Sequence, residues 1–309
     1  MAHMVRCVAT IMRSFRFITP LALTALVWVG LLRAEPPLPQ GALEKRALFS
    51  PEEIKDWWAA ECSVEPSAKH AKDAAQSLHW QVKVDYHAGE KAYPIGWPRT
   101  GRRFAPAMQD WSEWDYLRAW IYADTSRAAL PREPAGLGVR FSGGLQDFNL
   151  RLTDLKKGVW TELLIPLSKL PGTKGVESMQ FNISEQNYAH GDTLDFYVSD
   201  LALLRHTEPT LLAFTPERTV MYADAALLPV VVHLAGVKSG ETRELTCELR
   251  RGGKVVARLT VPITRGPQRL ALSLDGKHPA PGDYELAATV AGNPAAVTAK
   301  LRLVESPWK

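Results

Sequence analysis

The sequence predicts an all-β protein that contains two consecutive β-sandwich domains. Apolar and polar residues alternate over many short runs, which is the pattern of strands with one buried face. Turn-forming residues separate these runs, and no long amphipathic helix pattern lies between them, which argues against an α/β architecture. The composition, with 46% hydrophobic and 23% charged residues, is that of a globular chain.

The N-terminal segment has the features of a secretory signal peptide. Arginines precede an apolar run over residues 17–32, and Ala34 is followed by a polar, proline-rich start. We expect residues 1–34 to be the signal peptide and residues 35–46 an entry segment. An uncleaved anchor is the alternative, although the run is shorter than the ~20 residues that span a bilayer. The mature chain is therefore expected to be secreted, periplasmic or on the cell surface, without a membrane span.

Residues 47–205 show the first series of strands. Before them, the run Ser50-Pro51-Glu52-Glu53 predicts a short helix with a serine cap, a proline at its first position and a capping box closed by Glu53. Period-two strands are predicted at residues 78–85, 116–123, 136–141, 148–152, 160–167, 179–183 and 194–204.

Residues 206–309 show a second series of strands, after a short linker at residues 205–209. The predicted strands are residues 211–214, 228–234, 244–249, 255–263, 268–274, 284–290 and 296–304. About seven strands in ~100 residues is the size of an immunoglobulin-like (Ig-like) sandwich, here without its Cys-Trp-Cys pattern. Cys62 and Cys247 fall in different predicted domains, so no disulfide within a domain is expected.

Charge and motifs exclude several functions. The net charge of +4 is small for 309 residues and comes partly from the N-terminal segment, so no nucleic-acid partner is expected. The sequence has no zinc-ligand spacing and no common catalytic motif. Asp110, Glu113 and Asp115 are the only dense acidic group beside aromatic residues, and turn and capping roles suffice to explain them. We therefore expect a protein that is not an enzyme.

Several short motifs occur in a recognisable order. They are Leu48-Phe49, Tyr93-Pro94-Ile95-Gly96-Trp97-Pro98, Asp110-Trp111-Ser112-Glu113-Trp114-Asp115-Tyr116-Leu117, Gly158-Val159-Trp160-Thr161 with Ile165-Pro166-Leu167, and Leu194-Asp195-Phe196-Tyr197-Val198-Ser199-Asp200-Leu201. This set resembles the jelly-roll (galactose-binding-like) carbohydrate-binding modules found beside bacterial polysaccharide-degrading enzymes. The resemblance implies a jelly-roll β-sandwich for residues 47–205, followed by the smaller Ig-like β-sandwich. Ser199 departs from the paired aspartates of the family, and Ala74-Ala75 stands where the family often has glycine.

The resemblance also implies a structural calcium ion. Such modules often hold Ca²⁺ through carbonyls and acids near the first and last strands. Asp200 matches the family position, and Glu53, or its neighbour Glu52, is the candidate for the second acid. Calcium needs several oxygen ligands at once. The alternative is that Asp200 only hydrogen-bonds a loop.

Candidate sugar-binding residues lie in two loops. Tyr93, Trp97 and Arg99 occupy a proline- and glycine-rich stretch outside any periodic strand, and Asn187 and Tyr188 precede the last strand of the first domain. An aromatic ring can stack on a sugar, while planar polar groups bind its hydroxyls. The alternative is that Tyr93 and Trp97 cap the core under a long loop.

The other tryptophans are interpreted as packing residues. By their spacing, this group is Trp57, Trp58, Trp80, Trp120 and Trp160.

Two functional hypotheses follow. The first is an exported, non-catalytic carbohydrate-binding accessory protein, or the N-terminal region of a glycoside hydrolase, with a polysaccharide or oligosaccharide as ligand and a possible catalytic partner domain. The second is a structural or protein-interaction (adhesion) module of the cell envelope. Solvent exposure of Tyr93 and Trp97 would favour the first.

Overall fold

The computed structural model describes residues 42–87, 96–143, 146–274, 276 and 279–308. The expected signal peptide and Tyr93 lie outside these residues. Almost all regular structure in the described ranges is β-strand, in agreement with the predicted all-β class. None of the described helices is long and apolar enough to cross a membrane.

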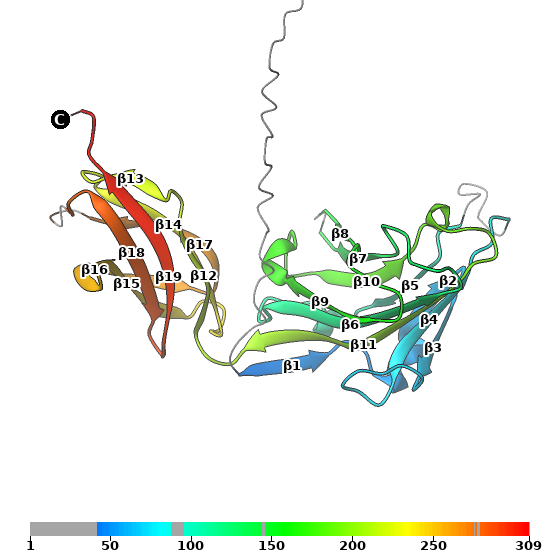
Figure 1. Cartoon of the computed structure of the whole chain (residues 1–309). Coiled ribbons are helices and arrows are strands. Elements are labelled where there is room, and N and C mark those ends of the chain that lie inside the picture. Colours follow the sequence, from blue (N-terminus) through cyan, green and yellow to red (C-terminus); the bar gives the residue numbers. More distant parts are fainter. Residues whose placement is uncertain (1–41, 88–95, 144–145, 275, 277–278, 309) are drawn as a thin grey trace, which may run out of the picture. The chain divides into compact units, whose positions relative to one another are not determined.

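The first sandwich is a jelly roll made of two antiparallel sheets (Figure 1). We call them the β11 sheet and the β10 sheet after their central strands. The β11 sheet has the order β3-β4-β11-β6-β9, with β1 also paired to β11, and the β10 sheet has the order β2-β5-β10-β7-β8. The strands are β1 (Leu43–Ala47), β2 (Trp57–Ala60), β3 (Ser63–Ser67), β4 (Ser77–Lys83), β5 (Arg99–Arg103), β6 (Tyr116–Thr125), β7 (Gly136–Phe141), β8 (Phe148–Arg151), β9 (Trp160–Pro166), β10 (Val176–Asn182) and β11 (Thr193–His206).

The core of this sandwich follows from the alternation along each strand. On β4, Leu78, Trp80 and Val82 point inward and are at most 1% exposed. Trp80 stacks on Phe196 of β11 with ring centroids 4.7 Å apart and lies 6.4 Å from Phe181 of β10. Because successive residues of a strand point to opposite sides, the residues between these core positions face away from the core.

The predicted helix at Ser50 is a short 3₁₀-helix, η1 (Pro51–Asp56). Ser50 makes no side-chain cap hydrogen bond, so the expected capping box is wrong. Glu53 instead forms two hydrogen bonds with Arg102, at 2.8 and 3.0 Å. The remaining 3₁₀-helices are η2 (Pro106–Met108), η3 (Leu167–Lys169) and η4 (Glu185–Asn187).

The helix ends before the two tryptophans, which belong to strand β2. Trp57 points into the core and is 5% exposed, whereas Trp58 points outward and is only half-buried. Trp58 thus packs over the outer surface of the sheet and not in the core. The pairing of β2 with β5 puts the two side chains on opposite sides of the sheet.

The second sandwich has a separate hydrophobic core. Its strands are β12 (Thr210–Pro216), β13 (Val220–Tyr222), β14 (Leu227–Ala235), β15 (Thr242–Arg251), β16 (Lys254–Thr264), β17 (Gly266–Ser273), β18 (Gly282–Val290) and β19 (Asn293–Val304). They form the sheets β12-β14-β17 and β13-β19-β18-β15-β16. Cys247 is buried in this core and Cys62 in the first sandwich is half-buried, and both are free thiols. The Ig-like assignment stays a prediction.

Candidate functional site

The outward side of the β10 sheet presents a row of polar and flat groups. In the strand register, Gln180 of β10 lies opposite Gly101 of β5 on one side and Gly138 of β7 on the other. Trp58 and Asn149 extend the row at its two ends. We call this outward side of the sheet the amide face. Its residues are Trp58, Ala60, Arg99, Gly101, Arg103, Gly136, Gly138, Arg140, Asn149, Arg151, Glu177, Ser178, Gln180 and Asn182, of which Glu177 is exposed at a bulge of β10.

Three side-chain amides of this face have unused hydrogen-bonding groups. Gln180 is only 7% exposed, and its side chain makes no hydrogen bond to any other described residue. The same is true of the side chains of Asn182 and Asn149 within the described ranges. Each amide offers two N–H donors and a carbonyl acceptor. Because polar groups with little access to water normally find partners, an unpaired amide such as that of Gln180 is suited to a polar ligand.

Glycines leave space at the surface of the amide face, because they have no side chain. A Cβ atom at Gly101 would lie 2.5 Å from the Met179 carbonyl oxygen and 2.7 Å from the Trp58 ring, so the Trp58 indole lies across Gly101. A Cβ atom at Gly136 would lie 2.9 Å from Oδ1 of Asn182. The alternation Gly-Leu-Gly-Val in β7 thus places apolar side chains in the core and leaves space outside.

Trp97 and Arg99 lie at one edge of this face. The Arg99 guanidinium is 4.6 Å from the centre of the Trp97 ring and donates a hydrogen bond to the Trp97 carbonyl. In the register, Arg99 is opposite Asn182. The Trp97 N–H donates to Glu61 Oε2 at 2.6 Å, and the Gly96 N–H donates to Glu185 Oε2 at 2.9 Å. These carboxylates hold the loop so that a half-buried aromatic ring stands beside the amides.

Asn187 and Tyr188 support neighbouring loops. The Asn187 amide donates to the carbonyl of Glu133 at 2.8 Å, just before β7. The Tyr188 hydroxyl donates to the carbonyl of Pro134 at 2.7 Å, and the ring is 3% exposed. Burial raises the pKa of the Tyr188 phenol. Tyr188 therefore offers no ring face for stacking in this conformation, because its ring is part of the core.

The outward side of the β11 sheet is also rich in aromatic residues, and we call it the aromatic face: His79, Trp120, Tyr122, Trp160 and Tyr197. Its histidine is paired within the chain, whereas the indole N–H of Trp120 is buried without a hydrogen-bond partner among the described residues. His79 Nδ1 lies 3.1 Å from Glu65 Oε1, and His79 Nε2 lies 2.8 Å from Asp195 Oδ1. The His79 ring stacks on Tyr197 at 4.4 Å.

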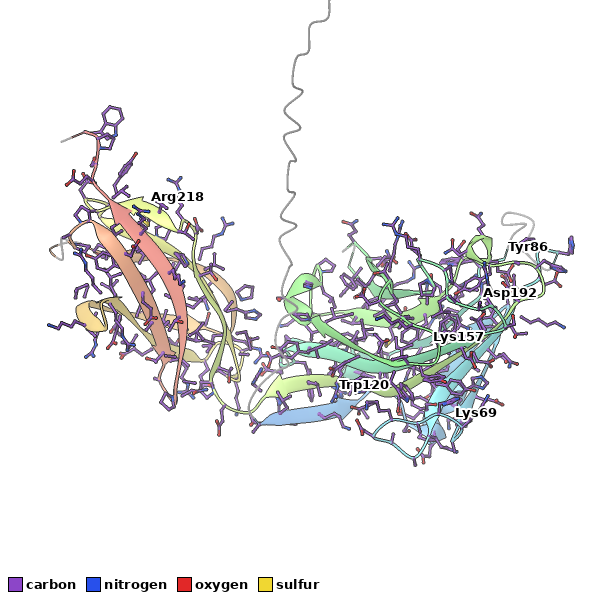
Figure 2. The ribbon with its side chains drawn as sticks, viewed as in Figure 1. Lys69, Tyr86, Trp120, Lys157, Asp192 and Arg218 are labelled. Atoms are coloured by element: carbon purple, nitrogen blue, oxygen red, sulfur yellow. The ribbon has the colours of Figure 1, made fainter. Side chains whose placement is uncertain are left out.

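A segment of the chain, residues 68–76, covers part of the aromatic face (Figure 2 labels Lys69 and Trp120). His70 stacks on Tyr122 with ring centroids 4.1 Å apart, and Lys72 lies 4.4 Å from the centre of the Trp120 ring. The Ser199 hydroxyl donates to the Lys72 carbonyl at 2.6 Å and accepts from the Lys72 N–H at 3.1 Å. The aromatic face thus already contacts its own chain.

The carboxylates of both proposed calcium ligands form ion pairs with cationic side chains. Asp200 pairs with Lys45 at 2.7 Å and with Arg118 at 3.2 Å. Glu53 pairs with Arg102, which holds the pKa of Glu53 below its usual value. No cluster of three or more metal-ligating side chains occurs in the described part of the chain. Calcium binding stays a prediction.

The acidic group near Trp111 has structural partners. Asp110 accepts a hydrogen bond from the Ser112 N–H at 2.9 Å, and the Ser112 side chain together with this N–H lowers the pKa of Asp110. Asp115 is 6% exposed and accepts from the His206 N–H at 2.8 Å. The contact of Asp110 is the turn role expected from the sequence, whereas Asp115 binds the end of strand β11.

No family model matches the chain, and no curated protein matches its sequence. Among solved structures, it is similar to a family 11 carbohydrate-binding module from Clostridium thermocellum in complex with a β-1,3-1,4-mixed-linked tetrasaccharide, at 14% identity and a TM-score of 0.33 over 53% of this chain and 96% of that one. It is also similar to a β-1,2-glucanase from Parabacteroides distasonis, at 15% identity and a TM-score of 0.34 over 82% of this chain and 36% of that one.

A third similar structure is a carbohydrate-binding module specific for non-crystalline cellulose, at 12% identity and a TM-score of 0.31 over 48% of this chain and 87% of that one. The chain thus spans about a third of the length of the glucanase, but nearly all of the family 11 module. Because these TM-scores are below 0.5, we base the functional argument on this chain's own residues.

Proposed function

We propose that the chain is an exported, non-catalytic carbohydrate-binding protein, or the accessory region of a glycoside hydrolase, and that the amide face binds the polysaccharide. The observation that carries this proposal is the set of unpaired amides on a glycine floor, above all Gln180. A sugar carries donors and acceptors on every hydroxyl, so planar amides can bind it with paired hydrogen bonds.

Aromatic rings at the border of the amide face add surfaces on which a sugar ring can stack. The Trp58 ring lies over Gly101, and the Trp97 ring lies next to Arg99. Flat rings offer apolar surface to the C–H side of a sugar ring, while the amides bind its hydroxyls. An open sheet surface accommodates a long chain that extends beyond the site on both sides, which suits a polysaccharide.

Export and the accessory role rest on other features. The basic and apolar N-terminal segment is the pattern of a signal peptide. The non-catalytic assignment is supported by the structural partners of Asp110 and Asp115, which leave neither free for acid–base chemistry in a cleft.

Polysaccharide pull-down and a glycan array, each with and without calcium, test the proposal on the purified chain. Gln180→Ala is expected to abolish detectable binding, and Trp97→Ala to weaken it. Trp120→Ala removes a tryptophan from the aromatic face of the same sandwich and is the control, expected to bind as the native chain does.

Retained binding by Gln180→Ala together with loss by Trp120→Ala would place the site on the aromatic face and contradict the proposal. Failure to bind any polysaccharide in either condition would favour the structural or adhesion module instead.

A further inference from the structure

The second sandwich exposes apolar side chains where β13 and the start of β14 lie. Val220, Tyr222 and Leu227, between 46% and 52% exposed, are three of the eight exposed large hydrophobic residues in the described part of the chain. Val220 and Tyr222 alternate with Met221, which packs against the core. Because water disfavours contiguous apolar surface, a cluster of this kind indicates a contact surface.

The three residues line one groove, which has a volume of about 580 Å³. Its lining also includes Pro229 of β14 and Ala271 of β17, which lie opposite each other in the strand register. Both occupy outward positions, because their neighbours Leu228 and Leu272 are buried in the core. A volume of this size is within the range of pockets that hold small-molecule ligands, so the groove has room for a large aromatic side chain.

Arg218 adds a cation to the lining of the groove (Figure 2 labels Arg218). It is exposed, and its side chain has no ion pair or hydrogen bond with any residue that the structure describes. The neighbouring Glu217 pairs with Arg269 at 3.6 Å instead. A guanidinium is attracted to the face of an aromatic ring, most strongly to that of tryptophan. The apolar walls and the unpaired guanidinium together therefore suit an indole.

Trp308 is an indole that its own chain leaves unburied. It is 87% exposed, more than any other large hydrophobic residue that the structure describes. It lies four residues beyond Val304, the last residue of β19, which lines the groove and pairs with Tyr222. Exposure of so large a ring to water is unfavourable. An indole and a groove suited to it thus lie close together in sequence and register, but the indole is not buried in the groove.

The segment that carries Trp308 favours contact with another molecule. Figure 1 shows this segment continuing beyond the end of β19. Pro307 has a fixed φ angle, and Ser306 before it is disfavoured from the helical region, so the segment resists winding back toward its own groove. Four residues reach up to about 14 Å from Val304, which is enough to present the ring to a neighbouring molecule.

We propose that the groove binds a second copy of this chain, and that the Trp308 indole of each copy docks in the groove of the other. The exchange is reciprocal, so the pair has twofold symmetry. An aromatic side chain buries about 150–250 Å², so two indoles and the surfaces that they cover bury about 600–1,000 Å² in total. This area is below that of a standard interface, so the dimer is weak and reversible. The groove lies outside the amide face, and the inference does not rest on the proposed function.

Sedimentation velocity of the purified full chain, from about 1 to about 300 µM, measures the association. We expect monomers at the low end and dimers at the high end, with a dissociation constant of about 10–100 µM. Trp308→Ala removes the indole, and Ala271→Arg puts a long cation into the groove at an exposed position. Each is expected to weaken the dimer at least about tenfold.

Val255→Arg is the matched control, because it introduces the same cation at an exposed apolar position of β16 outside the groove. It is expected to associate as the native chain does. Circular dichroism and the melting temperature confirm that each variant is folded.

Fluorine NMR distinguishes docking between copies from docking within one chain. The chain is labelled with 5-fluorotryptophan, and the Trp308 signal is the one that Trp308→Phe lacks. We expect this signal to shift as the concentration of the native chain rises. In Ala271→Arg it should stay at the position of an exposed indole at every concentration.

Three results would overturn the inference. The first is a monomer at every concentration, and the second is a dimer that persists unchanged in both Trp308→Ala and Ala271→Arg. The third is a Trp308 signal that is independent of concentration and yet moves in Ala271→Arg, because the indole would then dock in the groove of its own chain. None of these results bears on polysaccharide binding by the amide face.

Discussion

The two outward faces of the first sandwich both carry aromatic and polar side chains, but they differ in how many of these side chains have partners within the chain. The aromatic face pairs His79 with Glu65 and Asp195 and places residues 68–76 over Tyr122 and Trp120. On the amide face, Gln180 has no side-chain hydrogen bond in the described structure, although it is 7% exposed. The three amides without partners, those of Gln180, Asn182 and Asn149, are the reason for which we propose the amide face as the binding site, although the Trp120 N–H on the aromatic face is also unpaired.

After Gln180→Ala, the largest loss of affinity is expected from Trp58→Ala. If the amide face binds the ligand, loss of the ring over Gly101 removes a stacking surface, and affinity should fall about 10- to 100-fold. Calorimetry with the best ligand from the array measures the change. A Trp160→Ala variant on the aromatic face should change affinity less than about twofold. Equal losses of affinity in the two variants would contradict the proposal that only the amide face binds the ligand.

A smaller effect, on stability, is expected from Glu53→Gln. Arg102 is the inward arginine of the β10 sheet, with a side chain 5% exposed, and Glu53 is its partner, 40% exposed. Loss of the charge should cost about 1–2 kcal/mol at pH 7, less than for a fully buried pair because Glu53 is partly solvated. Urea unfolding of both proteins measures the difference.

The pH dependence of that difference has a defined sign. The folded-state pKa of Glu53 lies below its ordinary value of 4.5, because Arg102 donates hydrogen bonds to its carboxylate. The contribution is therefore fully present above about pH 4.5 and is lost as the pH falls through the lowered pKa. The native chain and Glu53→Gln should converge in stability in acid, and a constant gap at every pH would contradict this account.

Ser199→Ala tests whether the aromatic face is closed by its own chain. Removal of the hydroxyl deletes two hydrogen bonds to the Lys72 backbone and should cost about 1–2 kcal/mol. Hydrogen exchange at the Lys72 amide should become faster, while polysaccharide affinity stays unchanged. A gain of binding in this variant would show that residues 68–76 mask a second site.

The smallest effect is expected for calcium. Because Asp200 already pairs with Lys45 and Arg118, any rise of the melting temperature with calcium should be the same in the native chain and in Asp200→Asn. Differential scanning fluorimetry with calcium or a chelator measures it. A rise that Asp200→Asn abolishes would restore Asp200 as a calcium ligand.

The long strands could be predicted from the sequence, but several short ones could not. Alternation over residues 136–141 coincides with β7, because one side of that strand is buried. Strand β5, Arg-Thr-Gly-Arg-Arg, has no such alternation of apolar residues, since its outward side is arginine and glycine and its inward side includes Thr100 and Arg102. Strand β2 was not predicted, because the helix-start residues directly before it favoured a helix that continues into the two tryptophans.

The candidate site was predictable only at its edge. Trp97 and Arg99 stand out as an aromatic and a planar cation in a proline-rich loop, and they border the amide face. Gln180 and Asn182 alternate with core residues of β10, as any solvent-facing polar residues would. Only the three-dimensional structure shows that their amides lack partners and face a floor of glycine.

The most direct test of the central claim is to observe the side-chain amides themselves. In ¹⁵N-resolved NMR spectra, addition of an oligosaccharide of the bound polymer should shift the side-chain NH₂ signals of Gln180, Asn182 and Asn149. The indole N–H signals of Trp120 and Trp160 should stay in place. Shifts confined to those two indoles, with unmoved amide signals, would contradict the assignment of the binding site to the amide face.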